Sequence, residues 1–322
     1  MSEYSFVIGL FDTMVAISTL LLIASLGEII TERSGVVNLG IEGLLSVSAF
    51  LSFITTVITG SGYTGILVGA ASGGLFAVML AVTCVSLKAD QIVTGLMFSI
   101  LGLGLTSFFT GGWGGESIKT IPDLTVPVIG SIPVVGPIFF QNTVTEYIGI
   151  LLIPTVWYLL FRTRMGLNIL AVGEDPETAN SQGINVTHTR YIATIIGGVL
   201  MGTAGAHLSV SYTGLWTQGL IGGRGWIVIA LVIFARWNPF GALAGSVLFG
   251  FVEALAVRAQ GVTITDHVSL GPAIDSILLT LTDSNILQTY PYVITIISLV
   301  LISVYGYRST SAPDALMEQY YS

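Results

Sequence analysis

The sequence predicts an all-α, multi-pass membrane protein of about nine transmembrane helices. Of its 322 residues, 53% are hydrophobic and only 9% are charged, and the mean hydropathy is +0.88. A soluble protein carries about 25% charged residues, so this chain has too little charge to cover the surface of a water-soluble fold of its size. The apolar residues also lie in long runs, which is typical of membrane spans.

Nine apolar segments are long enough, or nearly so, to cross a hydrocarbon core of about 30 Å at about 1.5 Å per residue. They cover residues 10–30, 36–59, 64–87, 91–110, 146–161, 191–210, 225–235, 240–257 and 290–307. The seventh is too short to span alone unless it begins near residue 220. A weakly apolar stretch, 271–282, is expected to be a re-entrant or interfacial helix. Because no Lys or Arg precedes the first run, we expect a mature span there rather than a signal peptide.

Two polar gaps orient the spans. Residues 111–145 hold four prolines and one basic residue, whereas residues 162–190 hold Arg162, Arg164 and Arg190. Basic residues concentrate on the cytoplasmic side of a membrane. We therefore place the 162–190 loop inside the cell, and the other basic residues then divide in favour of this choice. The N-terminus and the Pro-rich 111–145 loop are expected outside, and the C-terminus inside.

Glycine pairs four residues apart predict where the helices approach most closely. The pairs are Gly69 with Gly73, Gly198 with Gly202, and Gly241 with Gly245. Such pairs allow close helix crossings in membranes. In a chain with 39 glycines, chance spacing is the alternative explanation for about half of them.

Composition and motifs argue against catalysis and against nucleic acid as a partner. The formal net charge is −8, whereas nucleic-acid binding needs basic patches. Three histidines and one cysteine offer little for a metal site, and the sequence contains no P-loop, GxSxG or HExxH motif. We expect one transmembrane domain over residues 1–322, without a cofactor of its own and without enzymatic activity.

The segment 34–43 is the first candidate functional element. Its glycines predict a break in helical geometry, and Asn38 is expected to cap a helix that carries Glu42 in its first turn. Broken helices at membrane depth are tolerated only where they are buried or line a cavity. We therefore predict that Asn38, Gly40 and Glu42 line a substrate pathway. An ordinary loop followed by a capped helix is the alternative.

The segment 166–185 is the second candidate. Asp175 is expected to cap a helix of about two turns that begins at Pro176, and Gly183 is expected to end it. A helix this short is not stable alone in water, so docking to another protein is one interpretation and a solvated loop is the other. The residues assigned to docking are Gly173, Glu174, Asp175, Pro176, Glu177, Ala179 and Gly183.

Three stretches of the chain resemble a known family. GEIITERSGVVNLGIEG (27–43), GLNILAVGEDPETANSQGIN (166–185) and GRGWIVIALVIFARWNPFGALAGSVLFG (223–250) look like the permease subunits of ABC importers. These belong with the branched-chain amino acid, ribose and simple-sugar permeases, and the form of the first stretch is most similar to the nucleoside-type branch. The resemblance covers residues 11–307.

The resemblance implies a division of labour. Two identical or homologous permease subunits form the path for a small polar solute, a separate cytoplasmic ATPase binds and hydrolyses ATP, and an external binding protein delivers the solute. The 166–185 loop would contact the ATPase. The expected function is import of nucleosides or simple sugars across the cell membrane of a prokaryote. A branched-chain amino acid permease is an alternative, and so is an ion-coupled secondary transporter that uses Asp12, Glu28 or Glu253.

Overall fold

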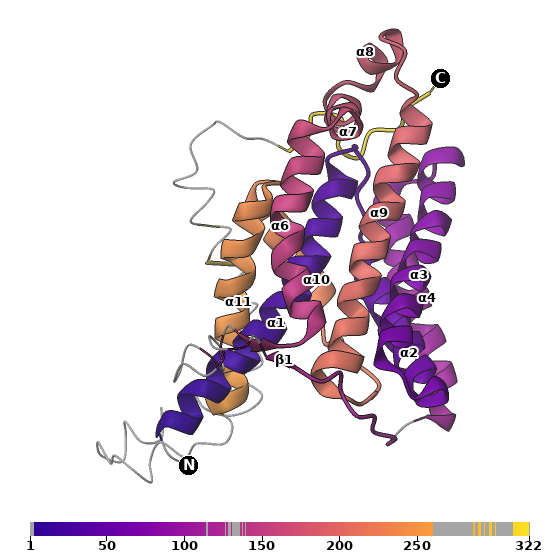
Figure 1. Cartoon of the computed structure of the whole chain (residues 1–322). Helices are drawn as coiled ribbons and strands as arrows, with labels where there is room; N and C mark the ends of the chain where they lie inside the picture. The colour runs from indigo at the N-terminus through magenta and orange to yellow at the C-terminus, as the bar shows by residue number, and fades with distance from the viewer. Residues whose placement is uncertain are drawn as a thin grey trace, which may run out of the picture.

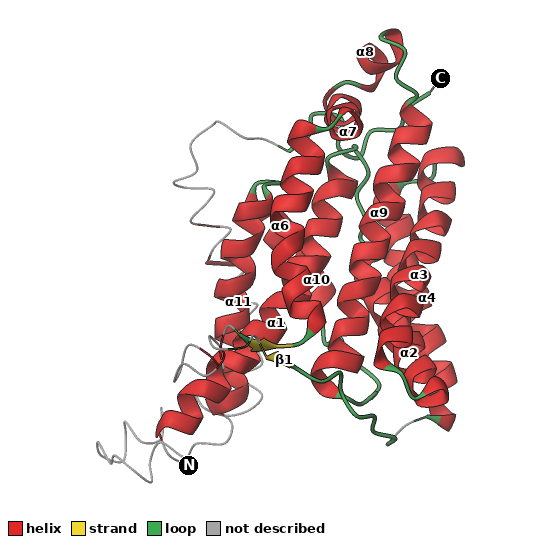
Figure 2. Ribbon diagram, in the orientation of Figure 1, coloured by secondary structure: helices red, strands yellow, loops and turns green. Residues whose placement is uncertain are grey.

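The computed structural model describes residues 3–259 except 114, 126, 128–129, 131–135, 137 and 139, then isolated positions between 286 and 300, and residues 312–321. Long helices running in alternating directions form a bundle (Figures 1 and 2). Within the described part, seven helices are long and apolar enough to cross a membrane. One shorter apolar helix accompanies them.

The helices confirm most of the expected spans. Eight of the nine predicted apolar segments fall on them, whereas 290–307 and the interfacial stretch 271–282 lie largely or wholly outside the described residues. The long helices are α1 (Glu3–Glu32), α2 (Ile41–Thr59), α3 (Gly62–Ala81), α4 (Gln91–Phe109), α6 (Val144–Arg162), α9 (Val186–Ala206) and α11 (Pro239–Ala259). A π-helical segment, η1 (Val82–Ser86), prolongs α3, and η4 (His207–Thr213) prolongs α9.

Glycines bring α3 and α9 together, as two of the three predicted pairs require. A Cβ atom added at Gly73 would overlap backbone atoms of Gly198 and Gly202. The sequence did not single out a second crossing, where a Cβ at Gly27 of α1 would lie 2.6 Å from the Gly197 carbonyl oxygen of α9. The third predicted pair, Gly241 and Gly245, faces residues of the preceding helix. Close backbone approach of this kind replaces the hydrophobic driving force that lipid cannot supply.

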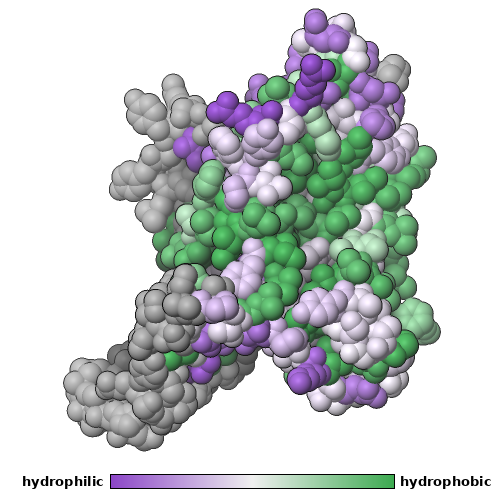
Figure 3. Space-filling model, viewed as in Figure 1, coloured by the Kyte–Doolittle hydropathy of each residue, from purple (hydrophilic) through white to green (hydrophobic). Residues whose placement is uncertain are grey.

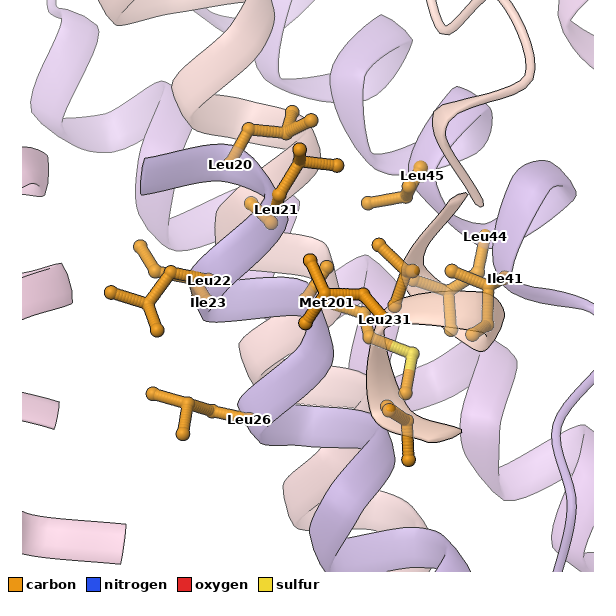
Figure 4. Close-up of a cluster of buried hydrophobic side chains, with 14 of the residues drawn as sticks. Leu20, Leu21, Leu22, Ile23, Leu26, Ile41, Leu44, Leu45, Met201 and Leu231 are labelled. Atoms are coloured by element: carbon orange, nitrogen blue, oxygen red, sulfur yellow. The ribbon is translucent and has the colours of Figure 1, made fainter. Parts of the chain in front are cut away.

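The core lies around α1, which is buried along most of its length. Leu20, Leu21 and Ile23 of α1 are fully buried, and they lie near side chains of three other helices (Figure 4). Those side chains come from α2, from α9 and from α10 (Arg224–Ala235). The bundle surface carries a hydrophobic band between more hydrophilic ends, as a membrane protein requires (Figure 3).

Helix α10 is too short to span a membrane. Its 12 residues rise about 18 Å at 1.5 Å per residue. Non-helical residues 214–223 lead into it from the end of η4, and they are tied to other elements: the Trp216 indole donates to the Thr110 hydroxyl at 2.9 Å, and Gln218 donates to Ser107 at 3.0 Å. Residues 214–235 therefore combine a non-helical first part with a half-helix, consistent with the prediction that 225–235 is too short alone.

The two ends of the bundle differ. One end carries α7 (Arg164–Glu174), α8 (Pro176–Ser181) and residues 312–321, and we call it the α8 end (Figure 1). The other end holds the N-terminus, the short helix η2 (Thr110–Gly112) and the strands β1 (Leu124–Thr125) and β2 (Gln141–Asn142). The antiparallel β1–β2 ribbon is a small exception to the all-α prediction. The predicted 111–145 and 162–190 loops thus lie at opposite ends of the bundle.

Candidate functional site

The break after α1 lies where the sequence predicts it, but α2 begins later than expected. Gly40, rather than Asn38, is the N-cap residue, and it makes no side-chain cap. Asn38 instead stabilises the non-helical stretch before the helix. Its backbone N–H donates to the Glu28 carboxylate at 2.9 Å, and its side-chain oxygen accepts from the Gly40 N–H at 2.9 Å.

The side-chain amide nitrogen of Asn38, Nδ2, lies 3.5 Å from the sulfur of Met201 on α9. The Asn38 residue is 2% exposed. A buried asparagine with these partners fixes the conformation of the break. That Asn38 also lines a substrate pathway stays a prediction.

Glu42 holds the beginning of α10. One carboxylate oxygen accepts from the Gly223 N–H at 2.8 Å, and the other accepts from the Gly225 N–H at 2.8 Å. The first N–H groups of a helix have no partner within the helix, and the helix dipole makes this end positive. Glu42 also lies in the first turn of its own helix. A single carboxylate, 6% exposed, therefore faces the positive ends of two helices.

Glycines allow this contact. A Cβ at Gly225 would lie 2.6 Å from the backbone nitrogen of Glu42, so only a glycine lets α10 approach α2 so closely. Gly223 has φ +84°, a left-handed conformation that glycine adopts without strain. The prediction of pathway residues did not include these two glycines. Their only signal in the sequence was the third family stretch, which begins at Gly223.

Helix α4 covers the other side of the break. The Ser99 hydroxyl donates to the Leu39 carbonyl at 2.8 Å. A Cβ at Gly40 would lie 3.0 Å from the Phe98 Cβ, and a Cβ at Gly43 would overlap the backbone of α4 at Phe98 and Ser99. Gly40 and Gly43 therefore let the break and the start of α2 pack closely against α4.

The short helix α8 forms as expected. Asp175 is its N-cap, and Pro176 is its first residue. The Asp175 carboxylate accepts from the Thr178 N–H at 2.9 Å and from the Thr178 hydroxyl at 2.5 Å. Gly183 follows the C-cap Gln182 by one residue and has φ +83°, the position and conformation that favour glycine after a helix. The predicted end of the helix is thus off by one residue.

Hydrogen bonds from Thr178 hold the pKa of Asp175 below its ordinary value. A carboxyl group whose pKa is depressed on folding stabilises the folded state above its ordinary pKa, and this contribution is lost as the pH falls through the lowered value. The Asp175 cap is therefore intact throughout the neutral range.

One side of α8 is packed and the other is free. Ala179 packs in a small cluster with Val172 and Val186, and Pro176 is buried. Asp175 and Glu177 are exposed, and the Glu174 side chain is 52% exposed. Among the residues assigned to docking, Pro176 and Ala179 are therefore buried and seat the helix, whereas Glu174, Asp175 and Glu177 are exposed.

The two predicted elements meet at Gly173, where α7 packs against the end of α1. A Cβ at Gly173 would overlap the Arg33 carbonyl oxygen and lie 2.9 Å from its carbon. The Arg33 guanidinium also lies 3.9 Å from the Glu174 carboxylate. The segment 166–185 therefore bears directly on the first residues of the helix break.

Residues 312–321 seal this contact. The Ala315 N–H donates to the Gly173 carbonyl at 3.0 Å, and the Met317 N–H donates to the Gly35 carbonyl at 3.1 Å. Arg190 of α9 joins the same assembly: its guanidinium donates to the Ser34 carbonyl at 3.2 Å and to the Glu318 carbonyl at 2.9 Å. The helix break, α7, α9 and residues 312–321 are thus tied together at the α8 end.

The carboxylates that suggested an ion-coupled transporter have structural partners in two cases. Glu28 accepts the Asn38 N–H, and Glu253 is paired with Arg224. Arg224 also donates to the Leu220 and Ile221 carbonyls that precede its helix. These partners occupy one oxygen of each carboxylate, whereas Glu28 Oε2 and Glu253 Oε2 are buried without a hydrogen-bond partner.

Comparison with known proteins settles the family. Residues 10–304 match the family described as the branched-chain amino acid transport system permease component. The chain belongs to this permease family. It is 43% identical, over 98% of both chains, to a putative glucose ABC transporter permease of Haloferax volcanii. It is 37% identical to a nucleoside ABC transporter permease of Lactococcus lactis, over 89% of this chain and 90% of that one.

A guanosine ABC transporter permease of Bacillus subtilis is 36% identical, over 74% of this chain and 78% of that one. No solved structure matches the chain significantly. The family confirms the resemblance that the three sequence stretches indicated, and with the seven span candidates it identifies a multi-pass membrane permease.

Proposed function

We propose that this permease imports nucleosides or simple sugars as the membrane subunit of an ABC transporter. The names of its relatives, which include glucose, nucleoside and guanosine permeases, support this substrate class. A separate ATPase supplies the energy, so the chain itself needs no cofactor. A second permease subunit, identical or homologous, completes the path, and an external binding protein delivers the solute.

The contact between Gly173 and Arg33 is the observation that carries the mechanism. It places the exposed acidic side of α8 on one side of a continuous assembly and the helix break on the other. We assign docking of the ATPase to Glu174, Asp175 and Glu177, whose carboxylates are available to basic residues of a partner. Movement of α8 would then displace residues 33–35 and, through them, the break that leads to Asn38 and Glu42.

The orientation follows from this assignment, because the ATPase acts in the cytoplasm. The α8 end faces the cytoplasm, and the N-terminus and the 111–145 loop face outward. In a Cys84→Ser background, a cysteine at exposed Glu116 is expected to react with a membrane-impermeant maleimide added to intact cells, whereas a cysteine at exposed Ser181 is not. Labelling in the reverse pattern would invert the orientation.

Uptake by cells tests the substrate class and the energy source together. Deletion of the gene in its native host is expected to abolish uptake of radiolabelled guanosine or of radiolabelled glucose, and the intact gene on a plasmid is expected to restore it. Depletion of ATP with the ion gradients maintained is expected to stop the same uptake. Uptake that persists after ATP depletion would favour the ion-coupled alternative. If deletion of the gene abolishes only leucine uptake, a branched-chain amino acid permease is favoured.

A further inference from the structure

The half-helix α10 is hydrogen-bonded at its beginning to Glu42 of α2, and the turn that follows it is hydrogen-bonded to the end of α1. Its first residues hold Glu42 through the N–H groups of Gly223 and Gly225. Its last residue, Ala235, precedes a tight turn formed by Arg236 and Trp237. The function proposed above involves Glu42, but it involves neither α10 nor Trp237.

The turn after α10 is strained. Arg236 and Trp237 have φ +55° and +54°, and two consecutive non-glycine residues in the left-handed region are uncommon. Such conformations persist only where the surrounding structure enforces them, and they gather at sites that move or bind. The contacts of Trp237 show what holds the turn in place.

Trp237 is bound to the end of α1 by both its side chain and its backbone. The indole N–H donates to the Glu32 carboxylate. The carbonyl oxygen accepts from Nε and Nη2 of Arg33, at 3.4 and 3.3 Å. Trp237 is 8% exposed, so water does not compete for these bonds, and a buried bond to a charged group is among the stronger ones.

Arg33 completes a continuous path to α8. Its carbonyl oxygen packs against Gly173, and its guanidinium lies between the Trp237 carbonyl and the Glu174 carboxylate. The same residue therefore contacts α7 and the turn after α10. From there, the hydrogen-bonded turns of α10 lead to Gly225 and Glu42. Because an α-helix is rigid over 12 residues, displacement of one end moves the other.

We propose that α10 transmits movement of the α8 end to Glu42, and that Trp237 is the positioning residue that attaches α10 to Arg33 and Glu32. This inference rests on the proposed function, since it assumes that an ATPase moves α8. Residues 33–40 also connect the end of α1 to Glu42 directly along the chain. They are non-helical between α1 and α2, and a non-helical segment transmits displacement less directly than a helix does.

Trp237→Phe is the variant that tests the attachment, because phenylalanine keeps an aromatic ring but lacks the indole N–H. Trp226→Phe is a matched control: Trp226 lies in the first turn of the same helix and is 41% exposed. Hydrogen exchange of the purified wild-type and variant proteins is followed at the amides of Gly223 and Gly225. We expect exchange there to rise about tenfold or more in Trp237→Phe, the factor that corresponds to about 1.4 kcal/mol, and to stay at the wild-type rate in Trp226→Phe. An unchanged rate in Trp237→Phe overturns the inference.

A second measurement relates α10 to transport. Uptake per ATP hydrolysed, in the complex purified from native membranes and reconstituted in vesicles, is expected to fall about tenfold in Trp237→Phe while the amount of copurifying ATPase stays at the wild-type level. Glu32→Gln, which keeps an oxygen acceptor for the indole, is expected to retain more uptake than Glu32→Leu. Wild-type uptake per ATP in Trp237→Phe overturns the inference.

If no ATPase copurifies with the wild-type chain, the proposed function fails, and the exchange experiment still decides whether Trp237 controls the far end of α10.

Discussion

Replacement of Glu42 by alanine is expected to destabilise the protein by about 3 kcal/mol and to abolish uptake. Alanine leaves the half-buried N–H of Gly223 and the buried N–H of Gly225 without their acceptor, and an unsatisfied buried donor costs about 1–3 kcal/mol. It also removes the charge that faces the beginnings of α2 and α10. The measurements are the thermal unfolding midpoint of the purified protein in detergent and the uptake of labelled solute by cells.

Glu42→Gln separates the two roles considered for this residue. Glutamine keeps one oxygen acceptor but presents an NH₂ group where a second acceptor is needed, so it is expected to lose less stability than alanine. Glu116→Ala, which removes an exposed carboxylate at the opposite end of the bundle from α8, is the control and should unfold like the wild type. If Glu42→Gln is as stable as the wild type yet transports nothing, Glu42 faces the pathway as well. If Glu42→Ala unfolds at the wild-type temperature, the hydrogen bonds from Gly223 and Gly225 to Glu42 do not contribute to stability.

The spans were predictable because each follows from local composition. Helix α6 is an example: residues 146–161 were predicted, and the helix covers Val144–Arg162. The apolar run sets the length, and the Thr143–Glu146 capping box sets the first residue. Helix α8 was likewise predictable because its N-cap, Asp175, and its first residue, Pro176, are adjacent in the sequence.

The start of α2 was predicted at the wrong residue for a physical reason. Asn38 is a good N-cap residue by type, but its side chain is already used by the Gly40 N–H and its backbone N–H by Glu28. A local turn bond to Gly40 and a contact with Glu28 of α1 therefore hold Asn38 in the non-helical stretch, and the helix begins at Ile41. The Glu28 contact lies ten residues back along the chain, where a local capping rule does not look.

The partners of Glu42 and Arg33 could not be predicted, because they are distant in the sequence. Gly223 lies 181 residues from Glu42, and Trp237 lies 204 residues from Arg33. Nothing in the local pattern indicates which buried N–H or carbonyl group a charged residue will meet. The sequence predicted functional roles for 34–43 and 166–185, and only the structure showed that the two segments touch.

Replacement of Gly173 by valine is expected to uncouple ATP hydrolysis from transport. The new side chain would collide with the Arg33 carbonyl oxygen, and backbone cannot move aside as a flexible side chain can. The chain must therefore shift α7 away from residues 33–35, which also strains the Ala315 N–H bond to the Gly173 carbonyl. Asp175 and Glu177 are exposed and would remain available to the proposed ATPase. Docking is thus expected to survive while transmission fails.

Gly104→Val is the matched control for this substitution. Gly104 is also a helical glycine, on α4, and a Cβ atom added there would meet no atom within 4 Å. Valine is therefore expected to be tolerated there, with wild-type assembly and uptake. A loss of uptake in Gly104→Val equal to that in Gly173→Val would mean that the effect is general to added bulk in the helices.

The number of solute molecules imported per ATP hydrolysed by the reconstituted Gly173→Val complex tests the contact between α7 and the helix break most directly. Vesicles contain the complex purified from native membranes and are supplied with ATP, binding protein and labelled solute. The expected result is wild-type copurification of the ATPase, continued ATP hydrolysis and at least a tenfold fall in solute imported per ATP. Wild-type import per ATP from a fully assembled Gly173→Val complex would show that the contact between Gly173 and Arg33 does not carry the coupling.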